Sequence, residues 1–275
     1  MGNRIIKYTS LHNIGLSIII LTASFIFSAC TNSQKSHQMK LFKIFKKKKN
    51  TELKDIEIKY DLSASNANNL KEIEIGNINL PTGKIIVSDP FFTHSAAPFA
   101  RTVAPGNYPV KLYITEVEPD HFRISFAKIK FKPENASRWI LAITEDIDIN
   151  DFKNLEDDDY FGFAVEAGLG CFIDAKTNKE YEVKIDAFYE NNPDKNYYDN
   201  LLADEFSKYS SGNEFSSDIG DWNNHIINKS TSSNVIMFSS GWGDGYYPTY
   251  WGYNDNNETV ELTIDFMLYE ENEGE

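Results

Sequence analysis

Apolar and polar side chains alternate with a two-residue period in nine short segments, as they do in half-buried β-strands. The segments are 56–60, 73–75, 84–87, 110–114, 122–131, 139–143, 161–165, 235–238 and 260–268. Turn residues separate them at Pro81–Gly83, Pro105–Asn107 and Asn254–Asn257. This pattern predicts an antiparallel β-sandwich or a barrel-like sheet.

Helical spacing replaces the alternation between Lys176 and Ser211. Apolar and aromatic side chains recur there every three or four residues, as Tyr198, Leu201, Leu202, Phe206 and Tyr209. Pro193 interrupts the segment, so we expect one or two helices at about 178–210, packed on the sheet. The predicted class is β-dominated α+β, in a single domain over residues 55–271.

The first 29 residues have the parts of an export signal. Arg4 and Lys7 precede an apolar run at 14–27, which is shorter than the about 20 residues that a membrane span needs. Phe27-Ser28-Ala29-Cys30 resembles the lipobox of bacterial lipoproteins, in which the cysteine thiol is lipidated. We therefore expect a signal peptide at 1–29, lipidation of Cys30 and an extracytoplasmic location at a membrane.

A basic segment follows the predicted anchor, at 30–54, with Lys46–Lys49 at its centre. Beside a lipid anchor this tether is suited to anionic headgroups, although a solvated linker explains it equally well. An alternative start of translation at Met39 would remove the signal and leave the protein in the cytoplasm.

Charge is divided unevenly along the chain. Residues 1–50 hold nine Lys or Arg and no acidic residue, which leaves 18 basic and 41 acidic side chains, a net charge of −23, for the remainder. Such a surface repels phosphate backbones, so we expect no binding to nucleic acid. Cations, neutral ligands and basic protein surfaces are the compatible partners. Apolar neighbours predict that the second cysteine, Cys171, is a buried thiol.

A glycine- and aromatic-rich segment at 241–252 is the first candidate site. Trp242 and Asp244 alternate with three glycines, and Tyr250 and Trp251 follow. Exposed aromatic faces in such a loop stack on sugars or organic cations, and a carboxylate there can hold a cation. The alternative is a tight turn in which Asp244 accepts backbone N–H groups and the aromatic rings fill the core.

Carboxylates beside turns form the second candidate site: Asp89, Glu166, Asp174 and Asp244. If they converge, they have the chemistry to bind a divalent cation or to act as a general acid and base. Acidic residues are abundant in this chain, and each of these alone is more often a turn or surface residue than a member of a site. The five histidines have no metal-ligand spacing, and no Gly-x-Ser-x-Gly motif is present.

Four segments together resemble the bacterial family called domain of unknown function 4241. They are Leu80–Pro90, Val103–Val110, Glu166–Asp174 and Ser240–Gly252, within a likeness that spans most of residues 70–267. The resemblance implies a common fold and a common cluster of Asp, Gly and aromatic positions.

Three functions are compatible with these features. The first is a non-catalytic module, held at a membrane, that binds a ligand or protein through residues 241–252. The second is a metal-assisted hydrolase that uses the acidic residues, and the third is an immunity-type protein that neutralises a basic partner.

Overall fold

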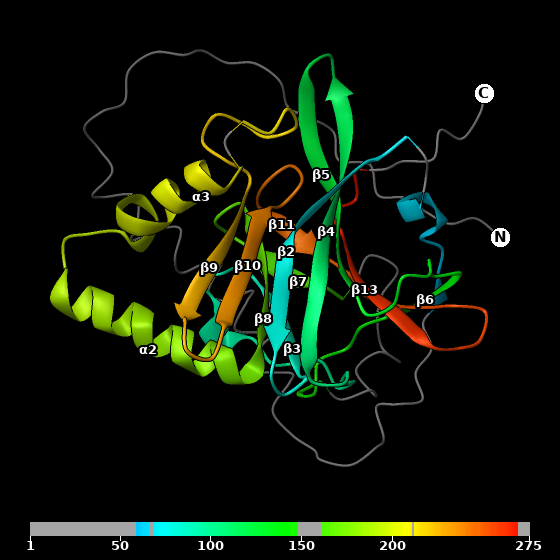
Figure 1. Ribbon diagram of the computed structural model, residues 1–275, viewed down its shortest axis with the longest axis horizontal. Coiled ribbons are helices and arrows are strands. Elements are labelled where there is room, and N and C mark those ends of the chain that lie inside the picture. The colour runs from blue at the N-terminus through cyan, green and yellow to red at the C-terminus, as the bar shows by residue number, and fades with distance from the viewer. Residues whose placement is uncertain (1–58, 67–68, 148–160, 211, 269–275) are drawn as a thin grey trace, which may run out of the picture. The chain divides into compact units, whose positions relative to one another are not determined.

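The computed structural model describes residues 59–66, 69–147, 161–210 and 212–268 (Figure 1). The predicted signal peptide, Cys30, Met39 and the tether with Lys46–Lys49 lie outside the described residues. Within the described part, no helix is both long enough and apolar enough to span a bilayer. All the elements below belong to one unit, residues 52–145 and 160–275. The single domain at 55–271 stays a prediction.

A seven-stranded sheet is the largest element of the fold, and all its neighbouring strands are antiparallel. In spatial order the strands are β1 (Lys59–Tyr60), β6 (Arg138–Leu141), β12 (Thr249–Tyr253), β13 (Thr259–Asp265), β5 (His121–Lys130), β4 (Gly106–Glu118) and β2 (Lys71–Leu80). The β4–β5 hairpin extends beyond the other strands (Figure 1).

A second, four-stranded antiparallel sheet contains β3 (Ile85–Ser88), β8 (Leu169–Asp174), β10 (Ser233–Ser239) and β9 (Trp222–Asn228), in that order. A short ribbon pairs β7 (Phe163–Val165) with β11 (Gly245–Tyr247). Two 3₁₀ turns, Ser63–Asn66 and Thr93–Ser95, complete the β-rich part.

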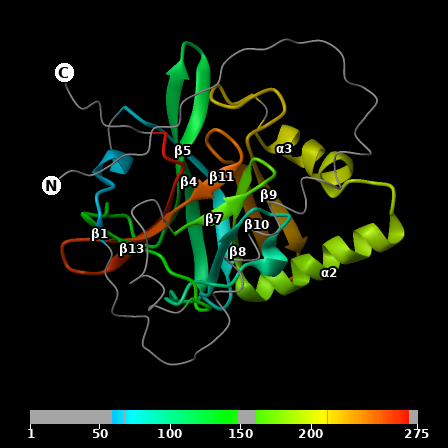
Figure 2. The ribbon, with the colours of Figure 1, turned by 180° about the vertical axis from the view of Figure 1, so that it is seen from behind.

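Two α-helices, α2 (Ala175–Asn191) and α3 (Ala203–Ser210), lie beside the four-stranded sheet (Figures 1 and 2). Asp174 caps α2, because its side chain accepts a hydrogen bond from Lys176 N. The helix ends two residues before Pro193, and a single π-turn, Tyr198–Leu202, leads into α3. The predicted helical region and its division at Pro193 are confirmed.

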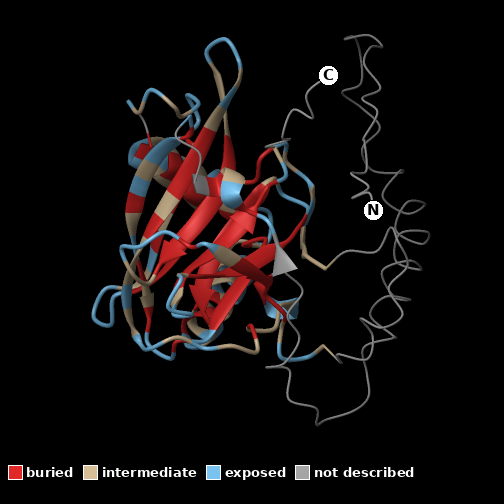
Figure 3. Cartoon of the chain, turned by 90° about the vertical axis from the view of Figure 1, so that its right-hand side faces the viewer, coloured by how far each residue is buried: buried red, intermediate tan, exposed pale blue. Residues whose placement is uncertain are grey.

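Two hydrophobic cores lie on opposite faces of the four-stranded sheet. Ile236 and Phe238 of β10 point into the core shared with the seven-stranded sheet, whereas Val235 and Met237 point into the core under the helices. This alternation matches the two-residue period of a strand. The four-stranded sheet is therefore the middle layer, with the seven-stranded sheet on one face and the helices on the other. Most residues in the middle of its strands are buried (Figure 3).

The predicted class is confirmed: in the described part of the chain, antiparallel sheets dominate and two α-helices accompany them. The alternation did not predict four strands, β8, β9, β11 and β12. Every residue of β8 is buried, because both faces of its sheet are covered, so the strand shows no polar alternation. The segment 241–252, interpreted as a loop, contains only a short turn before β11 and β12.

Candidate functional site

Three distant segments of the chain meet at the turn between β7 and β8. The backbone N–H groups of Glu166 and Ala167 both donate to Asp89 Oδ2, at 2.9 and 2.8 Å. Asp89 Oδ1 accepts from Phe91 N at 2.9 Å. A single buried carboxylate therefore holds both its own turn and a turn almost eighty residues later.

The 240–244 segment holds the same turn from its other end. Gly168 N donates to Asp244 Oδ1 at 3.0 Å, and Ser240 N donates to Gly168 O at 3.0 Å. Within the segment, Gly243 N donates to Ser240 O and the Ser240 hydroxyl donates to Gly243 O. Gly168 has a φ of +65°, which glycine adopts without strain. The turn-amide interpretation of Asp244 matches this geometry.

Burial raises the pKa of Asp89, and the nearby charge of Glu166 adds to this effect, while the three backbone donors oppose it. Its two oxygens already serve as acceptors for the three amides. This carboxylate is therefore a structural anchor of the turn rather than an open ligand for a cation.

Asp174 lies at the opposite end of β8 from this turn. One of its oxygens caps α2, and the other accepts from the backbone and the hydroxyl of Thr82 at 3.0 and 2.8 Å. The structure thus brings Asp89, Glu166 and Asp244 to one turn but leaves Asp174 apart. Among the described residues, no group of three or more His, Cys, Asp or Glu side chains is arranged to hold a metal ion.

The aromatic residues of segment 241–252 divide into buried and exposed members. Tyr250 and Trp251 are only 4% and 1% exposed, because β12 is an inner strand of the large sheet. The expectation that they offer open faces to a ligand was therefore wrong. Tyr247 is also buried, and its hydroxyl donates to Gly243 O at 2.8 Å, which supports the turn from below.

Trp242 is the exposed aromatic at the tip of this turn, with 62% of its surface open. The Arg123 guanidinium lies 5.3 Å from the centroid of its ring, and the His121 ring meets it edge-on at 6.2 Å. Both partners come from the start of β5, on the projecting hairpin. We call Trp242, His121 and Arg123 the Trp242 patch. A cation–π contact of this kind fixes the indole at an exposed position.

Sequence reasoning missed the two β5 members of this patch. His121 and Arg123 carry no motif, and only their i, i+2 spacing on one strand indicates that they share a face. Their proximity to Trp242 depends on pairing between strands that are far apart in the chain.

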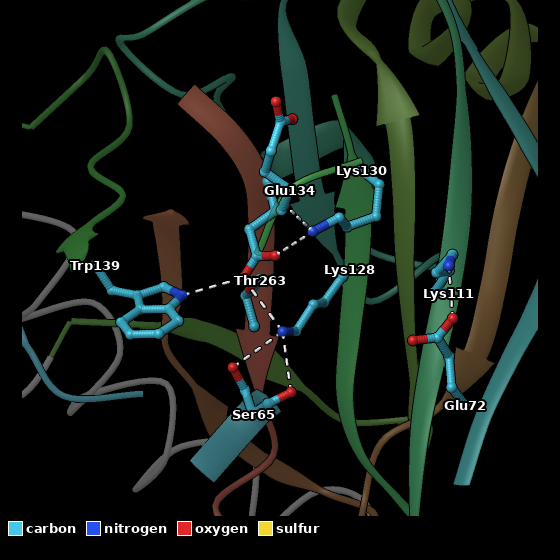
Figure 4. Close-up of polar contacts among 9 residues, drawn as sticks. Ser65, Glu72, Lys111, Lys128, Lys130, Glu134, Trp139 and Thr263 are labelled. Atoms are coloured by element: carbon cyan, nitrogen blue, oxygen red, sulfur yellow. Dashed lines mark hydrogen bonds and ion pairs between the residues drawn. The ribbon is translucent and has the colours of Figure 1, made fainter. Parts of the chain in front are cut away.

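A buried ionic cluster lies on the seven-stranded sheet (Figure 4). Glu261 accepts from Lys130 at 2.8 Å and from the Trp139 indole at 3.1 Å, and Lys128 Nζ lies 3.2 Å from it. Burial lowers the pKa of Lys128, and Glu261 only partly offsets this effect. Burial opposes ionisation of Glu261, but its two lysine partners outweigh burial and lower its pKa. The cluster holds strands together.

A second polar chain, also missed from the sequence, joins α3 to β9. His225 Nδ1 lies 2.7 Å from Glu205 Oε2, and its Nε2 lies 3.0 Å from the Tyr197 hydroxyl. His225 and Tyr197 are buried beneath the helices. This carboxylate–imidazole–phenol chain orients the helices on the sheet. Cys171 is buried in the same core, and burial raises the pKa of its thiol, which agrees with its predicted role.

Neither the curated proteins nor the solved structures contain a significant match to this chain. A family does match, over residues 78–264, and this range includes the β7–β8 turn and both segments that anchor it, Asp89 and residues 240–244. The match covers well over half of the chain. On this basis the chain belongs to the family described as Protein of unknown function (DUF4241).

Proposed function

We propose that this protein is a non-catalytic binding module that recognises a protein partner through the Trp242 patch. Lipidation of Cys30 would hold the module at a membrane, outside the cytoplasm, with Lys46–Lys49 against anionic headgroups. The anchor part of the proposal rests on the sequence features of residues 1–54.

The exposed indole of Trp242 carries the proposal. It stands on the 240–244 turn, which is hydrogen-bonded to the β7–β8 turn through Ser240 and Asp244, and Arg123 lies against its ring. Trp and Arg are the residue types most enriched among the energetic hot spots of protein interfaces. Because the turn is already ordered, binding through it loses little conformational entropy.

The charge of the module indicates the kind of partner. With a net charge of −23 beyond residue 50, the surface favours a basic protein and disfavours nucleic acid. An immunity-type role, in which the module neutralises a basic protein, shares this chemistry. Association should therefore slow as the salt concentration rises.

The alternative of a metal-assisted hydrolase has lost its geometric basis. It required Asp89, Glu166, Asp174 and Asp244 to face a common cavity. Instead, Asp89 and Asp244 accept hydrogen bonds from the β7–β8 turn, and Asp174 caps a helix elsewhere. The exposed side chains of the Trp242 patch support binding instead.

Photo-crosslinking tests the interface directly. A benzophenone amino acid in place of Trp242, in the full chain expressed in its native host, should give a discrete covalent adduct with one protein. The matched control has the same amino acid at Val183, which is 68% exposed on α2. The same adducts from both positions, or none from position 242, would refute the proposed interface.

Trp242→Ala separates binding from folding. This variant should remove the partner while leaving the thermal transition near the wild-type value, because it truncates an exposed side chain. Tyr250→Ala is the contrasting change, since it empties a core position and should cost about 3 kcal/mol or more. Equal destabilisation by the two changes would show that Trp242 is only structural.

The anchor has its own test. Mass spectrometry of the mature protein should find a diacylglyceryl group on Cys30 as the first residue, and Cys30→Ser should release the protein from the membrane fraction. A mature protein that begins at Met39 in the soluble fraction would overturn the anchor while leaving the Trp242 interface open to its own experiment.

A further inference from the structure

A concave feature, separate from the Trp242 patch, lies beside the start of β13. It is a cavity of about 290 Å³ lined by Ala100, Arg101, Thr102, Trp251 and Thr259. Thr259 begins β13, whereas Gly241 adjoins Phe266, just past the end of this strand. A seven-residue strand is roughly 23 Å long, so the cavity and the patch are different sites.

The segment that forms one wall of the cavity is held on both sides by backbone hydrogen bonds. Ala100 N donates to Ile143 O at 2.9 Å, and Val103 N donates to Gly83 O at 3.0 Å. Arg101 and Thr102 therefore stand at fixed positions beside the sheet.

Two buried hydrogen-bond donors at this place lack partners among the described residues. They are the indole Nε1–H of Trp251 and the hydroxyl of Tyr253. The two side chains are only 1% and 5% exposed. A buried donor without an acceptor costs about 1–3 kcal/mol, so each requires an explanation.

Two aromatic neighbours hold the Trp251 ring in place, so it does not turn to find an acceptor elsewhere. Trp251 is stacked on Phe131, with 6.1 Å between ring centroids, and meets Phe99 edge-on at 5.9 Å. Trp251 lines the cavity itself. Tyr253 borders it, because Thr259 is its cross-strand neighbour.

Positive charge is concentrated around the same tyrosine. The Arg138 guanidinium lies 4.6 Å from the centroid of the Tyr253 ring, and that of Arg101 lies 6.0 Å away. The neighbouring carboxylate of Glu258 is paired with Lys132 at 2.6 Å, and the described residues that line the cavity include no carboxylate. Two guanidinium groups at one ring are notable in a chain with a net charge of −14.

We propose that this cavity binds a small oxyanion, the phosphate or carboxylate group of a small molecule. Trp251 Nε1–H and the Tyr253 hydroxyl donate to its oxygens, and the Arg101 guanidinium supplies the opposite charge. The hydroxyl groups of Thr102 and Thr259 complete the donor set. A cation is disfavoured, because the Arg101 guanidinium repels positive charge and the indole N–H offers no acceptor. The cavity volume suits a small molecule rather than a peptide.

The test uses the full chain in detergent. Thermal unfolding gives its melting temperature, and titration calorimetry gives the heat of binding. The probes are inorganic phosphate and succinate, each compared with sodium chloride at the same ionic strength. This comparison is needed because salt alone stabilises a highly acidic protein by screening its charges. Phosphate or succinate should raise the melting temperature above the chloride value and give a saturable heat of binding.

Tyr253→Phe is the decisive variant. It removes only the hydroxyl, so binding of the oxyanion should weaken about tenfold or more. The melting temperature without probe should stay unchanged or rise, because the lost hydroxyl has no partner among the described residues. Tyr209→Phe is the matched control, since its hydroxyl donates to Ile75 O at 3.0 Å outside the cavity. That control should lose stability and keep binding.

Trp251→Phe provides a second variant, which removes the indole N–H and should also weaken binding. A response to phosphate alone or to succinate alone would support the site and identify the oxyanion it takes. The proposal is overturned if neither probe exceeds chloride, or if Tyr253→Phe binds both probes as wild type does.

Discussion

Asp265 at the end of β13 offers the sharpest test of the electrostatics. Its carboxylate is 7% exposed, and burial raises its pKa from 3.8 to about 6, although the Met267 N–H, 2.7 Å from Oδ1, partly opposes the change. We expect Asp265→Asn to stabilise the protein at neutral and alkaline pH, since the amide keeps an acceptor for Met267 and removes the buried charge.

The pKa shift sets the magnitude and its sign. The folded state holds the proton of Asp265 more tightly than the unfolded state, so stability falls as pH rises from about 4 to about 6. Above that window the ionised group destabilises the fold by roughly 3 kcal/mol. The gain from Asp265→Asn is therefore up to about 3 kcal/mol at pH 8, and about half as large at pH 5.

Urea unfolding at both pH values, followed by tryptophan fluorescence, measures this difference. Asp218→Asn serves as the control, because Asp218 is exposed and the same change there should have little effect at either pH. A gain from Asp265→Asn that is equal at pH 5 and pH 8, or a loss at pH 8, would refute the reasoning.

Three further outcomes follow from packing. Lys128→Met should destabilise by about 3–5 kcal/mol in urea unfolding, since it leaves the buried Glu261 with one cation fewer. Gly83→Ala should lower the free energy of unfolding by about 3 kcal/mol or more, because the added Cβ would lie 1.9 Å from the backbone oxygen of Val103. In Gly243→Ala the added Cβ meets nothing within 4 Å, so this change should cost only about 1–2 kcal/mol of backbone strain. Cys171 should resist iodoacetamide in the native protein and react only after unfolding, as read by peptide mass spectrometry.

The sequence predicted those elements whose two faces meet different environments. The helical spacing around Leu202 and Phe206, and its interruption at Pro193, corresponds to α2 and α3 because these helices cover the sheet with one face only. In β8 both faces are buried, so Gly170-Cys171-Phe172-Ile173 shows no alternation and the two-residue period does not identify this strand.

The candidate site was predictable only in part. Asp89 and Asp244 stand out because each lies beside Gly or Pro in a turn, but their shared target at 166–168 appears only after the strands pair. The exposure of Trp242 and the burial of Trp251 depend on sheet order, which aromatic composition does not encode. Arg123 belongs to no motif, and its i, i+2 spacing from His121 says only that the two share a strand face.

The contact between the 240–244 turn and the β7–β8 turn determines how Trp242 is presented. Gly168 bonds to both Ser240 and Asp244 at the base of Trp242 and lies 76 residues from Asp244 in the chain, so a synthetic peptide of residues 239–252 would lack it. The surface around Trp242 is thus a conformational epitope rather than a linear one. A binder raised against the folded protein at this place should fail on a denaturing blot, and a circular permutant cut elsewhere should still display it.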